Sequence, residues 1–476
     1  MVTGVRRKLD AAPVVPRGTS LTQESSSADA QLEHRKLSKL QALAAFSPDA
    51  LASIGYADQE IYLGLVVAGA VGLAMALPIA LAITGLLAIL ALSYTQIIRK
   101  YPSGGGSYEV ARKTLGTTPG LVAAAALIVN YLLNVAVSLT TGVDAIASAF
   151  PVLWGYRVII SLLLLLGMTV LNLRGMRESG IVMAIPVYLF VFSYFSMMGY
   201  GGVRLAVGGP LYPPIPPPAV VQPLTLALLL HTFSTGCTAM TGVEAISNGV
   251  PSFRSPETKN ASQTMVIMAF LMGILLLGSI GLIQVLAVVA GPQETVLSAL
   301  THRLLGSGPA YLIIQASTLI MLTVGANTSF AGLPRLMSVM ANDGYLPKRL
   351  AKMNSRQVFG SGIILLAVAS GLLITAFSGN SHALIPLFAV GVFLAWTLSQ
   401  SGMVRHWQRE RGKAWKLKAL LNGTGAVATA ITFVIVTSFK FFDGAWIAII
   451  LIPILVALFL HIHSRHVETL TPTVSQ

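Results

Sequence analysis

The sequence is poor in charge. Only 10% of its 476 residues are Asp, Glu, Lys or Arg, while 54% are hydrophobic. Soluble globular proteins carry about 25% charged residues. This deficit excludes an ordinary soluble domain and indicates that most of the chain is surrounded by lipid or by its own helices.

Cysteine is nearly absent, and catalytic signatures are missing. A single cysteine, Cys237, excludes an intramolecular disulfide and a Cys-rich metal site. The glycine-rich run 103–107 lacks the Gly-Lys-Ser/Thr ending of a phosphate loop. Residues 1–40 are polar and lack the apolar core of a cleavable signal peptide. We therefore expect a non-enzymatic protein without cofactor or metal.

Long apolar runs are what the chain has in abundance. A helix that crosses a membrane needs roughly 20 mainly apolar residues. Twelve stretches meet this requirement, and they predict an all-α membrane protein. They are 47–67, 73–98, 119–147, 156–173, 179–203, 222–249, 263–290, 308–340, 358–378, 383–403, 418–439 and 443–462.

The remaining segments suggest a simple organisation. Residues 1–40 form a polar N-terminal tail, disordered over 1–30, and residues 31–46 resemble a basic amphipathic helix on the membrane surface. Helices 1–10 would form a core over 41–403, helices 11 and 12 would follow over 404–463, and 464–476 would be a short polar tail.

The positive charges are distributed very unevenly. With the N-terminus taken as cytoplasmic, 27 of the 31 lysines and arginines fall on the cytoplasmic side. The outer side receives Arg157, Arg204, Arg303 and Lys440. Cytoplasmic loops carry such an excess. The net charge of +14 is thus a topology signal for a cytoplasmic (inner) membrane protein with both termini inside, and we expect no nucleic-acid partner.

Two predicted helices contain helix-breaking stretches at matching positions. Residues 53–58 in helix 1 and 234–242 in helix 6 mix glycine with polar residues. They occupy the first positions of two five-helix halves, helices 1–5 and 6–10, which is typical of an inverted-repeat transporter with its site between the breaks. The alternative is that the small residues only let helices pack closely. The candidate substrate-binding residues here are Gly55, Tyr56, Thr235, Gly236, Thr238 and Thr241.

Asp49 is a candidate proton acceptor at the cytoplasmic mouth. Tyr56 lies seven residues further, about two turns, and would face the same way. The simpler interpretation is a helix start, with Ser47 as N-cap, Pro48 at the first position and Asp49 favoured by the helix dipole.

Glu244 is the second candidate for proton coupling. It is expected on one helical face with Thr238 and Thr241. A carboxylate in the membrane is costly and needs a reason, so it could exchange a proton as the cavity opens. Alternatively, backbone amides of the break hold it in a purely structural role.

Helix 3 contributes two amides, Asn130 and Asn134, one turn apart, with Tyr131 beside them. They could ligate a cation or a polar solute, or they could hydrogen-bond between helices. Asp58 and Glu60 could line an entry path or a gate, and Asp144 is expected at the wet outer end of helix 3.

Several motifs resemble one family. PSGGGSY (102–108) resembles the first cytoplasmic loop of the amino acid–polyamine–organocation (APC) superfamily, and NTSFAGLPRLMSVMANDGYLP, ending at Pro347, resembles its eighth helix. TGVEAISNGVPSF (241–253) is similar to its sixth helix. The resemblance covers about residues 40–463 and implies two inverted five-helix repeats plus helices 11 and 12.

Within this superfamily, SPDALASIGYADQE (47–60) and LFAVGVFLAWTLSQSGMVRHW (387–407) look closest to bacterial proton-coupled potassium-uptake permeases. The resemblance implies that Tyr56, Tyr131 and Thr241 help to ligate the solute and that Asp49 and Glu244 handle protons. The chain departs from these permeases at their helix-3 aspartate, helix-3 threonine and helix-10 tyrosine, which are Asn130, Asn134 and Phe388 here.

These observations lead to two hypotheses. The first is a proton-coupled symporter for a small solute, potassium or an amino acid, in contact with membrane lipid and with a homodimer as an open alternative. The missing helix-3 carboxylate weakens the attraction for a bare cation, while bulky Tyr56 beside Gly55 argues against a glycine-rich pocket for a substrate carboxylate. The second hypothesis is a non-coupled channel or a transporter-derived solute sensor.

Overall fold

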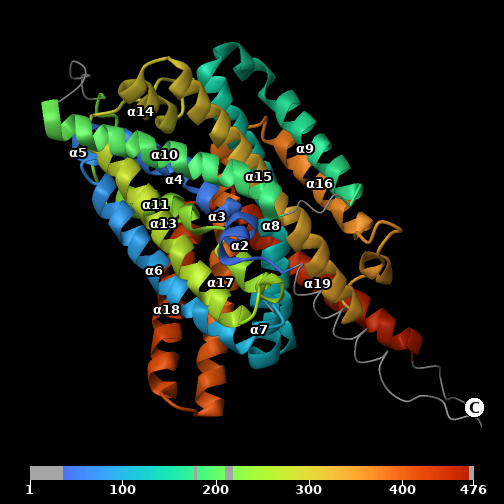
Figure 1. Ribbon diagram of the computed structural model, residues 1–476. Coiled ribbons are helices and arrows are strands. Elements are labelled where there is room, and N and C mark those ends of the chain that lie inside the picture. The colour runs from blue at the N-terminus through green and yellow to red at the C-terminus, as the bar shows by residue number, and fades with distance from the viewer. Residues whose placement is uncertain (1–35, 105, 176–179, 209–217, 471–476) are drawn as a thin grey trace, which may run out of the picture.

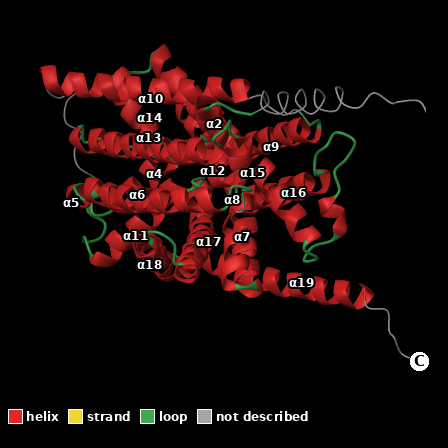
Figure 2. Cartoon of the chain, turned by 60° about the horizontal axis from the view of Figure 1, so that its bottom comes forward, coloured by secondary structure: helices red, strands yellow, loops and turns green. Residues whose placement is uncertain are grey.

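The chain is a bundle of helices. No strand occurs in the part that the computed structural model describes, where the only isolated bridge joins Leu37 to Phe253. The long helices lie side by side, and short helices lie both at the ends of the bundle and between the long ones (Figures 1 and 2). The all-helical fold class predicted from the sequence is confirmed. The described residues are 36–104, 106–175, 180–208 and 218–470.

Ten helical stretches in this part are long and apolar enough to cross a membrane. Their main helices are α6 (Ala76–Lys100), α8 (Thr117–Ala149), α9 (Arg157–Leu173), α10 (Gly180–Gly208), α11 (Leu226–Gly236) with α12 (Glu244–Asn248), α13 (Glu257–Val285), α15 (Pro309–Asn342), α17 (Ser381–Glu410), α18 (Trp415–Phe439) and α19 (Trp446–Leu470).

The two remaining predicted spans are also helical but shorter. The first is divided into α3 (Pro48–Ala52) and α4 (Ile54–Val66), and the ninth is α16 (Gly360–Ala376), which has 17 residues. Each predicted span therefore coincides with helix, while the count of twelve crossings stays a prediction. The short elements are α2 (Lys39–Phe46), α5 (Gly69–Leu73), α7 (Gly106–Leu115), α14 (Val296–Leu305), η1 (Pro151–Tyr156), η3 (Val250–Ser252), η4 (Lys348–Ala351) and the π-helix η5 (Phe441–Ala445).

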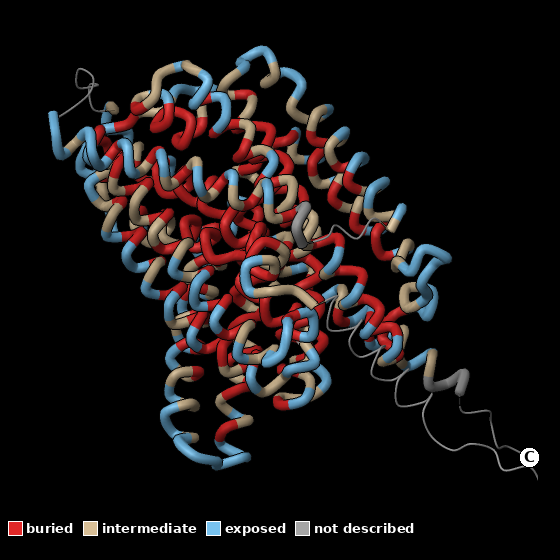
Figure 3. Tube along the Cα trace, viewed as in Figure 1, coloured by how far each residue is buried: buried red, intermediate tan, exposed pale blue. Residues whose placement is uncertain are grey.

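Helix α8 lies at the centre of the bundle. In its most apolar window 83% of the residues are buried, against 17% for the stretch Pro151–Leu173. It packs along α15 and α17. Four consecutive alanines, 123–126, are fully buried and allow close approach. The peripheral helices carry many exposed residues (Figure 3), and Leu163, Leu166 and Phe192 are examples of large apolar ones, as in helices that face lipid.

The sixth segment is interrupted. Helix α11 ends at Gly236, a 3₁₀ turn η2 (Cys237–Met240) follows, and Thr241 is extended at φ −63° and ψ 158°. Gly242 has φ +79°, a left-handed conformation that glycine adopts without strain, and α12 then begins at Glu244. The predicted helical face shared by Thr238, Thr241 and Glu244 is therefore wrong.

The first segment is interrupted much less than predicted. Only Ser53 separates α3 from α4, and its backbone stays near helical values at φ −62° and ψ −21°. The backbone N–H of Ala57 still bonds the carbonyl of Ser53. Most of the stretch 53–58 is thus ordinary helix, because glycine and serine do not break a helix whose hydrogen bonds remain satisfied.

The ends of the chain also differ from the prediction. The tail 1–30 and the first part of the predicted helix 31–46 lie outside the described residues, and the helix itself begins at Lys39. Helix α19 continues to Leu470, beyond the predicted end at 462. The backbone N–H of Leu37 bonds the carbonyl of Ser252 at 2.8 Å, and that of Arg254 bonds the carbonyl of Leu37 at 3.0 Å.

Candidate functional site

The interruption of the sixth segment lies against the first segment. The hydroxyl oxygens of Tyr56 and Thr241 are 2.7 Å apart, and both residues are 1% exposed. The hydroxyl of Ser53 donates to the carbonyl oxygen of Ala239 at 2.6 Å. The structure therefore brings together two residues that were predicted to bind solute, and they hydrogen-bond directly to each other.

Gly242 contacts the carboxyl group of Asp49. A Cβ atom at Gly242 would lie 2.8 Å from Oδ2 of Asp49 and 2.6 Å from the backbone nitrogen of Ala50. On another side, a Cβ at Gly325 of α15 would lie 3.2 Å from Cα of Asp49. Asp49 is thus enclosed by the interrupted segment and α15, and these glycines make room for it.

Asp49 itself is buried, and its Oδ1 has no hydrogen-bond partner among the described residues. The helix-start interpretation holds only in part. Pro48 is at the first position of α3, but the side chain of Ser47 makes no capping hydrogen bond. A buried carboxylate oxygen without a partner is costly, so a short helix start alone does not explain Asp49.

Glu244 faces a different neighbour. Its Oε2 accepts a hydrogen bond from Ser107 at 3.3 Å, and Oε1 has no partner in the described part of the chain. Ser107 in turn lies 3.2 Å from the hydroxyl of Tyr94. Ser107 and Tyr94 were not predicted from the sequence as neighbours of Glu244. Ser107 belongs to the PSGGGSY motif, the one sequence signal that pointed to it.

Asn134 makes one hydrogen bond to another helix, as in one of its two interpretations, and one within α8. Its amide donates to Ser329 of α15 at 2.9 Å, and its oxygen accepts from Ser138 at 3.2 Å. Oδ1 of the buried Asn130, by contrast, has no partner within the described residues. Tyr131 packs on Gly332, where a Cβ would lie 2.9 Å from the phenol oxygen.

Four other candidates make local contacts that a packing role explains. A Cβ at Gly55 would meet Thr318 at an ordinary 3.8 Å, whereas one at Gly236 would lie 2.7 Å from Ile61. The hydroxyl of Thr235 donates to the carbonyl of His231 at 2.8 Å. The hydroxyl of Thr238 donates to the carbonyl of Thr235 at 2.6 Å.

Comparisons with known proteins assign the chain to a family. A family model described as amino acid permease matches residues 38–460. The chain belongs to this amino acid permease family. It is 41% identical over 439 residues to the potassium transporter KimA of Bacillus subtilis (strain 168), across 91% of this chain and 71% of the relative.

Two more distant relatives are also transporters by name. The permease is 27% identical over 285 residues to the low-affinity putrescine importer PlaP of Escherichia coli (strain K12), across 55% of this chain and 59% of the relative. It is 25% identical over 359 residues to the branched-chain amino acid permease BcaP of Lactococcus lactis subsp. cremoris (strain MG1363), across 68% and 72%. These similarities and the apolar helices together indicate that the permease is a multi-pass membrane transporter.

A second polar cluster includes Asp58 and Glu60 in the middle of α4. Glu60 contacts Nδ1 of His382 at the start of α17, and Ser381 donates to Oδ2 of Asp144 at 2.9 Å. Asp58 accepts from Tyr194 at 2.9 Å. Asp144 is 5% exposed, so the prediction that it is wet is wrong. This cluster ties α4, α8 and α17 together at one end of the permease.

A third cluster fastens α7 to the end of α15. Tyr108 donates to Oδ2 of Asp343 at 2.8 Å, and Arg112 forms an ion pair with the same oxygen. Burial, followed by the hydrogen bond to Asp343, raises the pKa of Tyr108 above its ordinary value. Its phenol therefore stays protonated and remains a donor at physiological pH.

Proposed function

We propose that the permease is a secondary active transporter that moves a small solute across the cytoplasmic membrane by proton symport with alternating access. Its topology would be twelve helices, with two inverted five-helix repeats followed by α18 and α19 and both termini cytoplasmic. The excess of lysine and arginine on one side of the predicted spans supports this orientation.

One observation carries the proposal. In the interrupted segment Thr241 hydrogen-bonds to Tyr56, the next residue, Gly242, contacts the buried Asp49, and the buried Glu244 follows at the start of α12. Each carboxyl group has one oxygen without a partner in the described chain. Because a buried charge needs a proton or a counterion, this arrangement suits the joint movement of a cation and a proton.

The proposed roles follow from these contacts. Tyr56 and Thr241 would bind the solute with the main chain of the interruption, and Asn130 and Tyr131 would complete the site from α8. Asp49 and Glu244 would exchange the proton. Thr235, Gly236, Thr238 and Gly55 would shape the pocket through packing, and Asn134 would hold α8 to α15 through Ser329.

Potassium is the solute that we propose first. The relative with 41% identity is named a potassium transporter, and hydroxyl and carbonyl oxygens replace the hydration shell of this cation well. A second candidate is an amine or amino acid. The unpartnered amide oxygen of Asn130 supports it, since a neutral amide suits a polar organic solute as well as a cation.

Purified permease in proteoliposomes tests the proposal. We expect uptake of potassium, or of one member of an amine and amino-acid panel, that saturates, shows counterflow and acidifies the lumen. Flux without saturation and without counterflow would indicate a channel, and binding without flux would indicate a sensor.

Glu244→Gln is the decisive variant. It should still be stabilised against heat by the solute but should no longer acidify the lumen. Glu410→Gln, which removes an exposed carboxylate at the end of α17, is the matched control and should behave as the wild type. Normal proton coupling in Glu244→Gln would remove Glu244 from the mechanism.

A further inference from the structure

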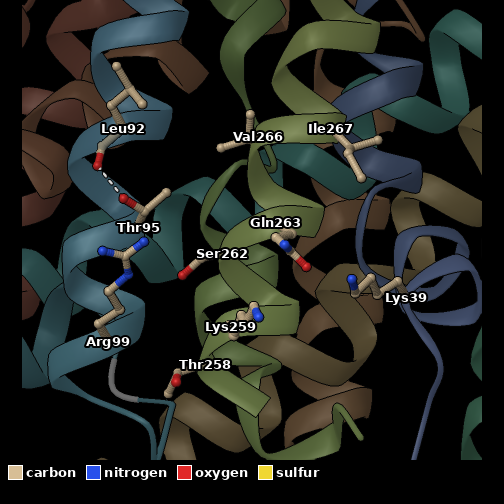
Figure 4. A pocket seen from close by; sticks show the side chains of 10 residues that line it. All are labelled: Lys39, Leu92, Thr95, Arg99, Thr258, Lys259, Ser262, Gln263, Val266 and Ile267. Carbon is tan, nitrogen blue, oxygen red and sulfur yellow. Dashed lines mark hydrogen bonds between the residues drawn. The ribbon is translucent and has the colours of Figure 1, made fainter. Parts of the chain in front are cut away.

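A cleft opens on the outside of the bundle along α13, with α6 on one side and α2 on the other (Figure 4). Its volume is about 820 Å³, and ten residues line it (Figure 4). It lies at the end of α6 that carries Arg99 and at the beginning of α13. The proton and solute residues of the proposed site take no part in it.

Three cations from three helices line the cleft. They are Lys39 of α2, Arg99 of α6 and Lys259 of α13, and all three are exposed. No carboxylate is among the ten lining residues. Within the described residues none of the three forms an ion pair, and Glu257, close in sequence to Lys259, pairs with Lys36 instead. The cleft therefore has an uncompensated positive charge.

A buried hydroxyl points to a ligand in the same place. Ser262 lines the cleft and is 5% exposed, yet its Oγ has no hydrogen-bond partner among the described residues. Two more hydroxyls line the cleft, on Thr95 and Thr258, and that of Thr95 donates to the carbonyl of Leu92 at 2.7 Å. A buried hydroxyl rarely stays without a partner, and an oxygen-rich anion held by the three cations would supply one.

The rest of the cleft is apolar. Leu92 is 47% exposed, Val266 46% and Ile267 45%. They belong to the stretches Gly69–Lys100 and Glu257–Val285, both apolar enough to cross a membrane. Cations at the end of two such helices with exposed aliphatic side chains next to them match an amphiphile with an anionic head and hydrocarbon chains.

We propose that this cleft binds an anionic phospholipid. The phosphate would lie between Lys39, Arg99 and Lys259 and accept a hydrogen bond from Ser262, while the acyl chains would lie on Leu92 and Val266. A free phosphate would use the same cations but leave the aliphatic wall uncovered, so we favour the lipid. The bound lipid would hold α2 against α6 and α13.

The test uses purified full-length permease in detergent micelles. Phosphatidylglycerol and phosphatidylcholine with the same acyl chains, and inorganic phosphate, are titrated separately while the melting temperature is followed. Retained lipid is counted by native mass spectrometry. We expect phosphatidylglycerol to raise the melting temperature, phosphatidylcholine to do so much more weakly, and inorganic phosphate to have no effect.

Arg99→Gln combined with Lys259→Gln should raise the half-saturating phosphatidylglycerol concentration about 25-fold, since each basic residue near an anionic membrane contributes about fivefold. Arg409→Gln combined with Lys413→Gln is the matched control. It removes the same charge from exposed positions outside the cleft and should bind as the wild type. Equal weakening in both double variants would mean nonspecific charge attraction and would overturn the proposal.

Two further variants guard against a loss of folding. Ser262→Ala keeps all charges and should weaken phosphatidylglycerol binding severalfold through one lost hydrogen bond. Lys39→Gln changes an exposed residue at the start of α2 and should weaken it about fivefold. Unchanged binding in both, equal stabilisation by phosphatidylcholine, or the same stabilisation by inorganic phosphate alone would each overturn the lipid site.

Discussion

Tyr56 on α4 and Thr241 in the interrupted segment hold each other through their hydroxyl groups, 2.7 Å apart and almost fully buried. They are 185 residues apart in sequence. Because the two hydroxyl groups hydrogen-bond to each other, a solute that binds here must either break this bond by entering between them or be coordinated by both oxygens at once.

The first prediction concerns this pair. Tyr56→Phe and Thr241→Val each remove one hydroxyl, and each should weaken apparent solute affinity by about 1–3 kcal/mol, or roughly 5- to 150-fold. The double variant should lose less than the sum of the two, because the residues act together. Solute titration of proteoliposome uptake for the wild type and the three variants measures this. Strictly additive losses would show that the two hydroxyls bind independently.

A second prediction concerns the glycine beside Asp49. Gly242→Ala should destabilise the permease by about 2–4 kcal/mol and abolish transport, because φ is +79° and the new Cβ would collide with Ala50 and Asp49. Thermal unfolding and uptake of the same preparation measure both effects.

Two alanine controls accompany that variant. Gly85→Ala adds a Cβ with nothing within 4 Å and should stabilise α6 by about 0.5–1 kcal/mol. Gly55→Ala meets only Thr318 at 3.8 Å and should be tolerated. The helical backbone at Gly55 argues against an unwound main chain that binds solute there. Loss of transport in Gly55→Ala would contradict this and support such a role for Gly55.

The third prediction concerns the contact between Glu60 in the middle of α4 and His382 at the start of α17. Glu60→Gln weakens the contact with His382 that joins α4 to α17, so the permease should open more often there. Cys237, the single cysteine, is fully buried in η2 and can report on the opening. We expect maleimide to label it at least about fivefold faster, which corresponds to 1 kcal/mol. Glu410→Gln serves as the control, and an unchanged rate in Glu60→Gln would mean that the cluster does not close the permease.

A fourth prediction concerns the attachment of α7. Asp343→Asn removes the charge that Arg112 and Tyr108 share. Because the ion pair is partly exposed, the loss should be about 1–2 kcal/mol in thermal unfolding. Lys113→Gln breaks the exposed pair with Glu109 on the same helix and the cation–π contact of Lys113 with Tyr101, and it should cost less, about 0.5–1 kcal/mol. Equal effects of the two variants would argue against α7 being fastened through Asp343.

The sequence predicted the helices well because length and hydropathy determine them locally. The third span, predicted over 119–147, is α8 over Thr117–Ala149. Contacts between distant segments could not be predicted in this way. Nothing in local composition connects Ser107 to Glu244, and the glycine and serine around Gly55 suggested an unwound stretch that the packed helix does not have. Gly242 was part of a correctly located interruption, but its contact with Asp49 depends on how the segments pack.

The backbone bonds between Leu37 and the 252–254 loop have a mechanical consequence. These hydrogen bonds join the residues just before α2 to the loop that follows α12. A movement of the interrupted segment would therefore be transmitted to Leu37. If the interrupted segment moves in the proposed transport cycle, a fluorophore near Leu37 would report each cycle from outside the lipid.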